Sequence, residues 1–205
     1  MSLRDHLWRA GERAVESVPE ELRGDVYVVS FRISHGEHSI RTDDFTYPYD
    51  PYLAIGYNTE EHCRRMVDET SAEEDEARWS YAYMLLEEAP PIGHHPDDPV
   101  GTELYLAEVA SLGLWYDPRE LSEEEIAKRS QALIDHFDDL VIGLARHLHD
   151  SGHLEKVFGR PLPIVVFDMF RPIEGEATAA ANPPELIADY LAYCREAEGY
   201  ADEPR

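Results

Sequence analysis

Histidines cluster in the sequence where a long predicted helix ends. His147, His149 and His153 lie close to Asp150. His149 and His153 are four residues apart, the spacing that places two imidazoles on one helix face, as a pair of metal ligands requires. However, Gly152 interrupts the helix between them. We therefore expect these histidines to stabilise a helix end, with His149 and His153 kept as alternative metal ligands.

A second group of donors that suit a metal lies in the segment His94-His95-Pro96-Asp97-Asp98. Proline-rich loops rarely hold a metal without help from other elements, so we expect an ordinary polar loop here. The sequence therefore predicts neither a resident metal nor a cofactor.

Asp168 is the candidate catalytic residue. It stands near the end of an apolar segment, a position at which the sheets of α/β proteins often carry catalytic groups. No second carboxylate follows two residues later, and the chain lacks a nucleophile elbow, a P-loop and a dinucleotide-binding fingerprint. These absences favour a protein that is not an enzyme. The alternative is a hydrolase or metal-dependent enzyme that uses Asp168 with His149 or His153.

The charge of the chain is strongly negative. Asp and Glu number 43 against 18 Lys and Arg, which gives a formal net charge of -25. Residues 61–125 hold 18 of the acidic and 4 of the basic residues. Such a charge repels nucleic acid and anionic membranes and attracts basic proteins. Adaptation to high salt is the alternative explanation of the acidity.

Two stretches are candidates for binding a partner. The first is the acidic run of Glu73, Glu74, Asp75 and Glu76, which also suits a helix start because carboxylates complement the helix dipole. The second is the tyrosine-rich segment 45–57, because tyrosine offers a large contact area at a low entropy cost. Its candidate contact residues are Tyr47, Tyr49 and Tyr52. The same tyrosines can instead pack against the edge of a sheet.

The composition is that of a folded protein. Its 205 residues suit a single domain spanning 1–205, and a hydrophobic fraction of 43% with 10% aromatic residues supplies a core. Cys63 and Cys194 are too few for a disulfide framework, so we expect buried thiols. No segment is long and apolar enough to span a membrane, and the charged start does not resemble a signal peptide. We therefore expect a cytoplasmic protein.

The first half of the chain predicts one helix, a group of strands and a second helix. Ser2 and Asp5 form a capping pattern for a helix that ends before Pro19. Strands are predicted at 26–33 and 52–57, with a short strand at 38–42 that pairs with the first as a hairpin. Asn58 and Glu61 mark the start of a helix that ends near residue 69.

The second half predicts mostly helices. Ser71 with Glu74 marks a helix that continues into 77–88, residues 90–99 form a loop, and Thr102 begins a helix that ends near Gly113. Ser122 and Glu125 cap a long amphipathic helix that reaches Asp150. The apolar segment 162–169 hardly alternates, as in a central strand covered on both faces, and Asn182 begins the last helix. This order predicts an α+β fold: a small mixed sheet of about four or five strands packed against several helices, one of them long.

Three segments resemble a mainly bacterial family known as domain of unknown function 4303. They are PYLAIGYNTEEH, EARWSYAYML and HLHDSGHLEKVFGRPLPIVVFDM. In this comparison, residues 58–61 match an Asn-Thr-Glu-Glu helix start, and Phe158, Gly159 and Arg160 match a turn that leads into a strand ending at Asp168. The segment after Trp79 departs from the Ser-Pro of the family. The resemblance implies the same fold and supplies neither a reaction nor catalytic residues.

The leading hypothesis is a non-enzymatic, acidic binding protein of the immunity type. It neutralises a basic protein, such as a nuclease toxin, through residues 61–125, because complementary charge speeds encounter and covers a surface that binds nucleic acid. The rivals are the hydrolase described above and a sensor of small molecules.

Overall fold

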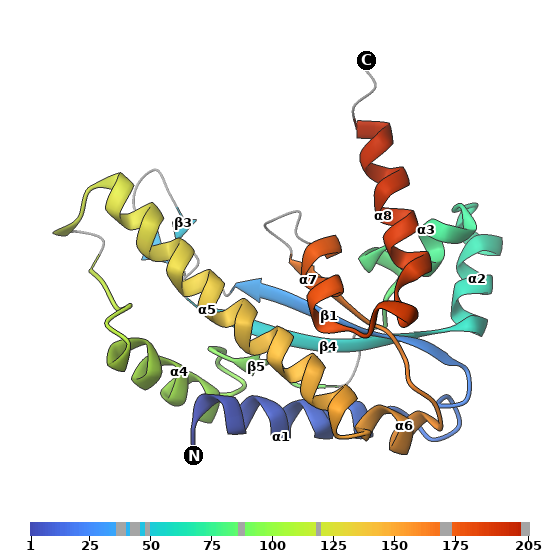
Figure 1. Cartoon of the computed structure of the whole chain (residues 1–205), viewed down its shortest axis with the longest axis horizontal. Coiled ribbons are helices and arrows are strands. Elements are labelled where there is room, and N and C mark those ends of the chain that lie inside the picture. The colour runs from blue at the N-terminus through green and yellow to red at the C-terminus, as the bar shows by residue number, and fades with distance from the viewer. Residues whose placement is uncertain are drawn as a thin grey trace.

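The computed structural model contains a four-stranded mixed sheet surrounded by helices (Figure 1). It describes residues 1–35, 40–41, 46–47, 50–85, 89–117, 120–168 and 174–201. The strand order is β5-β4-β1-β6, and the bounds are Val26–His35 for β1, Pro51–Thr59 for β4, Ile92–Gly93 for β5 and Ile164–Asp168 for β6. The predicted α+β fold with a small mixed sheet and one long helix is therefore confirmed.

Strand β1 lies inside the sheet, between β4 and β6. It runs antiparallel to β4 and parallel to β6, so that Ser30 lies between Gly56 and Val165. Because side chains alternate along a strand, Val29, Phe31 and Ile33 point to one face, while Val28, Ser30 and Arg32 point to the other. Each face meets its own set of helices.

A large apolar cluster covers the face of Val29 and Phe31. It is built by α1 (Leu3–Glu16), α4 (Pro99–Ser111), α5 (Glu123–Asp150), α6 (His153–Phe158) and α7 (Glu174–Ala181). Helix α5 has 28 residues, about 42 Å at 1.5 Å per residue, and crosses in front of the sheet (Figure 1). Its buried residues recur at helical spacing, as predicted, and the capping boxes of Ser2 with Asp5 and Ser122 with Glu125 are both formed.

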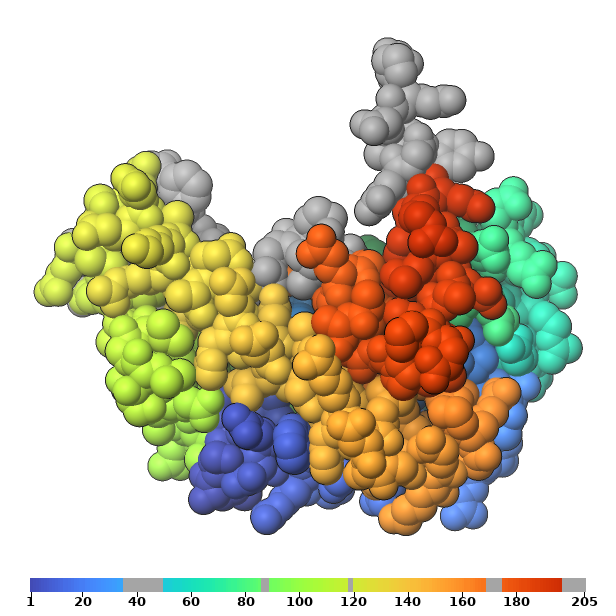
Figure 2. All heavy atoms as spheres, viewed as in Figure 1, coloured from blue at the N-terminus to red at the C-terminus, as the bar shows by residue number. Residues whose placement is uncertain are grey.

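A smaller apolar cluster lies on the opposite face, at one end of the sheet. It joins Tyr27, Val28 and Val165 to α2 (Glu60–Thr70), α3 (Glu74–Trp79) and α8 (Ala188–Ala201). Figure 2 shows that the outline of the molecule dips between the N-terminal part of α5 and helix α8. None of the helices in the described part of the chain is both long and apolar enough to cross a bilayer.

The apolar strand β6 lies at an edge of the described sheet, not at its centre as predicted. All five of its residues are buried, so the prediction of two covered faces is right. Its outer edge is covered by side chains from α7 and the residue after it: Thr178 Oγ1 accepts a hydrogen bond from Val166 N at 3.0 Å, and Asn182 accepts one from Ile164 N and donates one to Ile164 O, both at 2.7 Å. Asn182 therefore pairs with the strand edge. The last α-helix begins at Ala188, after the short helix η3 (Pro184–Leu186).

Other local predictions were wrong, because one short residue pattern can occur in more than one kind of local structure. The strand β2 (Ile40–Arg41) pairs with β3 (Thr46–Tyr47) in a separate ribbon instead of with β1. Ser71 ends α2 in a left-handed conformation with φ 59° and does not begin α3. The following helix stops at Trp79 and gives way to η1 (Tyr81–Tyr83). The predicted loop contains β5, and α4 begins at Pro99 with Asp98 as its cap, three residues before the predicted Thr102.

Candidate functional site

Helix α3 presents four carboxylates at its N-terminal end. Glu73 is its N-cap position, and Glu74, Asp75 and Glu76 form its first turn. All four residues are exposed, and none forms an ion pair or a side-chain hydrogen bond within the described residues. We call these four residues the acidic quartet.

The C-terminal half of α3 anchors the acidic quartet to the body of the protein. Ala77 is fully buried and Trp79 is 5% exposed. The Trp79 ring meets the edges of Tyr27 and Tyr190, with centroids 5.9 Å and 5.6 Å away. Edge-to-face contacts of this kind add about 0.5–1.5 kcal/mol beyond the burial of area. A helix of six residues is too short to be stable alone, so this packing holds the acidic quartet in place.

Arg78 ties α3 to α2 and to the sheet. Its guanidinium donates two hydrogen bonds to the carboxylate of Glu60, at 2.8 Å and 2.7 Å, and lies 4.1 Å from the centre of the Tyr27 ring. The Tyr27 hydroxyl in turn donates to Arg78 O at 2.6 Å. These hydrogen bonds lower the pKa of Glu60 and raise that of Arg78, while burial raises the pKa of Tyr27. Arg78 is thus paired with Glu60 and forms no ion pair with the acidic quartet.

Partly exposed aromatic side chains lie near α3. Tyr81 follows α3 directly, is 48% exposed and packs against Phe167 with ring centroids 6.2 Å apart. On α8, which packs against α3, burial and then the charge of Glu76 raise the pKa of the half-buried Tyr193. Tyrosines are enriched in protein-binding surfaces, and fixed carboxylates add a charge that attracts a basic partner.

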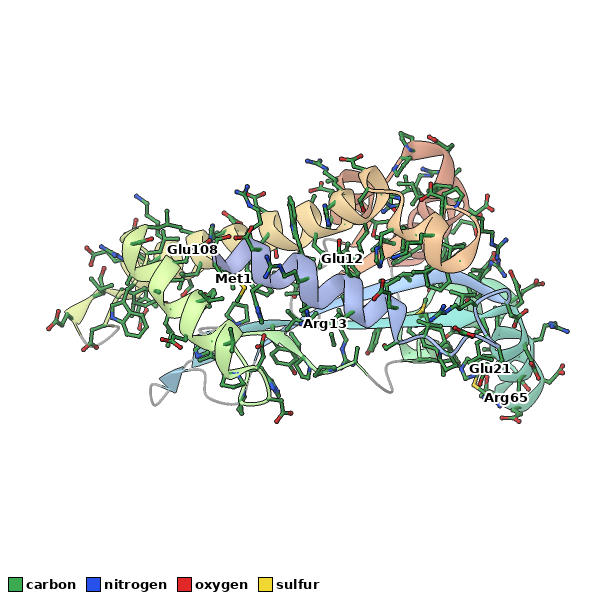
Figure 3. The ribbon with its side chains drawn as sticks, turned by 90° about the horizontal axis from the view of Figure 1, so that it is seen from below. Met1, Glu12, Arg13, Glu21, Arg65 and Glu108 are labelled. Atoms are coloured by element: carbon green, nitrogen blue, oxygen red, sulfur yellow. The ribbon has the colours of Figure 1, made fainter. Side chains whose placement is uncertain are left out.

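The acidic segment 61–125 does not form one continuous face, contrary to the sequence-based expectation. Helices α2 and α3 lie at one end of the longest axis, whereas α4 and the start of α5 lie at the other (Figure 1). Figure 3 shows the same separation between Arg65 on α2 and Glu108 on α4. The two ends separate because the chain crosses the molecule again through β5 before α4 begins. The region predicted to bind a partner thus reduces to the acidic quartet and its surroundings.

The late histidines serve the packing of helices. His149 Nε2 lies 3.1 Å from Asn182 Oδ1, and burial lowers the pKa of His149. His153 begins α6 after Gly152 and lies 3.3 Å from Glu12 O, and His147 lies 2.9 Å from Glu12 Oε1. The two predicted metal candidates therefore contact different elements. Within the described residues, no group of three or more His, Cys, Asp or Glu side chains can hold a metal.

The His94–Asp98 segment is also structural. Asp98 caps α4: its carboxylate accepts hydrogen bonds from Gly93 N and Gly101 N and lies 2.8 Å from His6 Nε2. Burial alone would raise the pKa of Asp98, but the bonds from Gly93, His6 and Gly101 outweigh it and hold that pKa below its usual value. Asp98, which the sequence suggested as a possible metal ligand, thus connects α1, β5 and α4.

Asp168 is buried, with 4% of its surface exposed, at the C-terminal end of β6 beside Ile33. His149 lies at the opposite end of this strand, because its partner Asn182 binds Ile164. The two ends are about 13 Å apart, given a rise of 3.3 Å per residue. The described structure therefore does not bring Asp168 and His149 into one site.

The predicted tyrosines are only partly described. Tyr52 is half-buried on β4, and its ring meets that of His95 at 4.7 Å, which agrees with packing near the edge of the sheet. Tyr49 lies outside the described residues, as does the side chain of Tyr47. Tyr81 and Tyr193, which lie near α3, were not predicted from the sequence as contact residues. The run of aromatic residues after Trp79 was a usable signal for Tyr81, whereas nothing local marks Tyr193.

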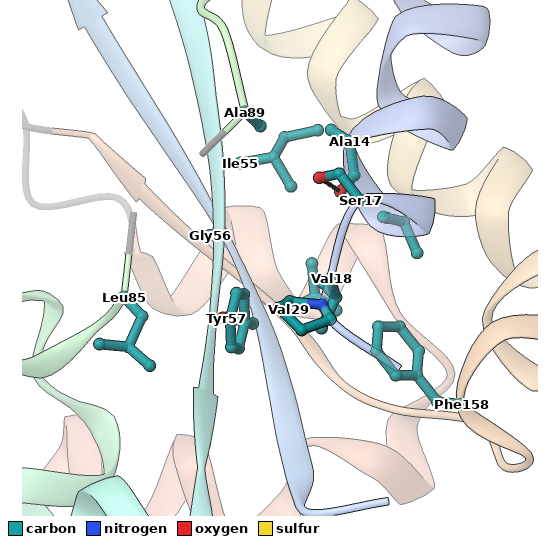
Figure 4. A pocket seen from close by; sticks show the side chains of 12 residues that line it. Ala14, Ser17, Val18, Val29, Ile55, Gly56, Tyr57, Leu85, Ala89 and Phe158 are labelled. Atoms are coloured by element: carbon teal, nitrogen blue, oxygen red, sulfur yellow. Dashed lines mark hydrogen bonds between the residues drawn. The ribbon is translucent and has the colours of Figure 1, made fainter. Parts of the chain in front are cut away.

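Two hollows lie beside helix α1. An apolar cavity of about 40 Å³ lies between the end of α1, the sheet and Phe158 (Figure 4), and its size suits a few water molecules but not a substrate. A wider groove of about 380 Å³ lies between α1 and α5, beside Arg4, Trp8 and Asp139. Its volume falls within the range of ligand pockets, but it is an open groove and not an enclosed cavity.

Comparisons of this chain with protein-family models, with curated proteins and with solved structures found no match. The resemblance to domain of unknown function 4303 therefore stays a prediction from the sequence.

Proposed function

We propose that this chain is a non-enzymatic binding protein whose acidic quartet contacts a basic protein partner. The observation that carries the proposal is the exposure of four consecutive carboxylates that are held on an anchored helix and paired with no described cation. A surface fixed before binding loses little conformational entropy on association. Its negative charge steers a positively charged partner and orients it on arrival.

The partner class that fits best is a basic nuclease of the toxin type, so that the protein acts as an immunity protein in the cytoplasm. A surface that binds nucleic acid is rich in Lys and Arg, and carboxylates placed opposite it cover the groups that contact phosphates. Tyr81 and Tyr193 supply apolar contact area beside the charges. Products of the neighbouring genes are the first full-length partners to test.

The test compares two variants of equal charge. The first neutralises the acidic quartet with Glu73→Gln, Glu74→Gln, Asp75→Asn and Glu76→Gln. The control neutralises four exposed carboxylates at the other end of the molecule: Glu103, Glu120, Glu123 and Glu124. Binding of a deca-arginine peptide is followed by NMR chemical shifts, and association rates with basic nucleases are measured over a range of salt concentrations.

We expect the first variant to associate about tenfold more slowly at low salt and to lose salt dependence, because steering raises association rates by about 10- to 1,000-fold. The control should keep most of the wild-type rate, and peptide-induced shifts should centre on α3. If both variants lost the same part of the association rate, the net charge of the protein alone would explain the effect. Unchanged rates in the first variant would remove the acidic quartet from the interface.

A further inference from the structure

Helices α1 and α5 pack together and leave a groove of about 380 Å³ at the surface (Figure 3). Residues three, four or seven positions apart share one face of a helix, and the groove is lined by one such face of each helix. The lining residues are Arg4 and Trp8 of α1 and His136, Asp139, Leu140 and Gly143 of α5. No residue of α2, α3 or α8 lines this groove.

Gly143 keeps the groove open. Apart from its chain neighbours and the helix backbone, a Cβ at Gly143 would meet no atom within 4 Å, whereas a Cβ at Gly11 would lie 2.7 Å from Leu144. The packing of α1 against α5 therefore requires a glycine at position 11 but not at position 143. A glycine inside a helix lowers its stability. A larger side chain at 143 would extend over the preceding turn, which carries Asp139 and Leu140, and would fill the groove.

Two rings of the groove are held in place by contacts within the protein. The half-buried Trp8 ring stacks on that of His147, with centroids 4.1 Å apart and planes inclined by 7°. His136 Nε2 lies 2.9 Å from Glu108 Oε1 on α4. Because these rings are already positioned, a ligand that binds here has few protein side chains to order.

Arg4 and Asp139 bring opposite charges to the same groove without pairing with each other. Both are exposed, and neither forms an ion pair or a side-chain hydrogen bond within the described residues. A guanidinium binds a carboxylate through two hydrogen bonds, and a carboxylate accepts hydrogen bonds from an ammonium group. The Trp8 indole adds aromatic surface beside the two charges. The groove thus offers complementary groups for a cation, an anion and an apolar side chain.

We propose that this groove binds a free α-amino acid with an aromatic or apolar side chain. The ligand's carboxylate contacts Arg4, its ammonium group contacts Asp139, and its side chain packs against Trp8. A ligand with only one of the two charges leaves the other charged residue of the groove without a partner. The proposal is independent of the proposed protein partner, because the acidic quartet lies outside the groove.

The first experiment is an NMR titration of the ¹⁵N-labelled protein with phenylalanine and two truncated probes. N-acetylphenylalanine lacks the ammonium group, and phenethylamine lacks the carboxylate. We expect phenylalanine to bind with a dissociation constant on the order of 1 mM, because an open groove surrounds only part of a ligand. Its shifts should centre on α1 and α5 around Trp8. Each truncated probe should bind about two- to fivefold more weakly, the contribution of one exposed ion pair.

The second experiment matches each variant to the probe that lacks its partner group. Asp139→Asn should weaken phenylalanine about two- to fivefold and leave N-acetylphenylalanine unchanged. Arg4→Gln should weaken phenylalanine by a similar factor and leave phenethylamine unchanged. A general disturbance of the fold would weaken all three ligands alike, so this pattern separates direct contact from a structural effect.

The third experiment fills the groove. Gly143→Met should abolish binding of all three ligands without lowering the urea midpoint, because methionine favours helix more than glycine does. Gly175→Met on α7 is the matched control, since a Cβ there also meets no atom within 4 Å, and it should bind phenylalanine like the wild type. The variant without the acidic quartet should do so too, so that the two proposals are tested apart.

Three results would overturn this proposal. The first is a titration in which phenylalanine gives no saturable shifts around Trp8. The second is phenylalanine binding that survives in Gly143→Met. The third is equal affinity for phenylalanine and both truncated probes, because Arg4 and Asp139 would then contribute nothing to recognition.

Discussion

Asn182→Asp tests how the edge of β6 is held. Asn182 accepts hydrogen bonds from Ile164 N and from His149, and its amino group donates to Ile164 O and to Thr178 O at 2.7 Å and 2.8 Å. These partners fix the orientation of the amide. Aspartate has the same shape but no amino group, so the substitution removes two donated bonds and turns a carboxylate oxygen toward two carbonyl oxygens.

The expected loss of stability follows from these contacts. Each carbonyl left without a donor costs about 1–3 kcal/mol. The stronger bond that a carboxylate accepts from Ile164 N offsets part of this loss. We therefore expect the free energy of unfolding to fall by about 3 kcal/mol at pH 7, measured by urea denaturation followed by circular dichroism. Ala179→Asp, which adds a negative charge on the exposed side of α7, is the control and should cost less than about 1 kcal/mol.

The pH dependence gives an independent readout of Asn182→Asp. In the wild type, burial lowers the pKa of His149 below its unfolded value, so the folded protein loses stability as pH falls below about 6.5. A carboxylate beside His149 favours the protonated ring, so this loss on acidification should shrink in the variant. A variant as stable as the control, or with the acid sensitivity of the wild type, would refute the hydrogen-bonded edge.

Two further substitutions test the packing and capping of α1 and α4. Gly11→Ala should lower the free energy of unfolding by about 1–2 kcal/mol, because its new Cβ would lie 2.7 Å from Leu144 Cδ2 in a filled core. Gly143→Ala, with no atom within 4 Å of its Cβ, should raise the free energy of unfolding by about 0.5–1 kcal/mol. Equal effects on the urea midpoints of the two variants would contradict the close approach of α1 to α5. Asp98→Asn should lower the free energy of unfolding by about 1 kcal/mol at pH 7, which is the usual contribution of a helix cap. This difference from the wild type should vanish as pH falls through the lowered pKa of Asp98, below about 4, because the wild-type carboxyl is then protonated too. A difference that stays constant in denaturation curves from pH 7 to pH 3 would contradict a charged cap.

The sequence predicted those elements whose signals are local. The capping boxes at Ser2 and Ser122 each combine a hydroxyl with a carboxylate three residues later, and both form. The same pattern at Ser71 failed, because Ser71 instead takes the left-handed conformation that ends α2. Which of the two conformations it adopts depends on where α2 stops, and that is set by packing beyond the reach of a four-residue pattern.

The candidate site was predictable only in part. The acidic quartet stood out in the sequence, but its anchoring by Arg78, Glu60 and Tyr27 joins residues up to 51 positions apart. The segment 61–125 looked like one acidic face because sequence counts take no account of the path of the chain.

The side chains along the outer edge of β6 also limit how this protein can meet other chains. A bare edge strand recruits extended segments from partners or from other copies, and so permits strand exchange, stacking into fibres and donor-strand docking. With Thr178 on Val166 N and Asn182 on both backbone groups of Ile164, a visiting strand finds no ladder to extend at these positions. Recognition on this side of the molecule must therefore use side chains and surface shape, and concentrating the protein should not lead to sheet growth from β6.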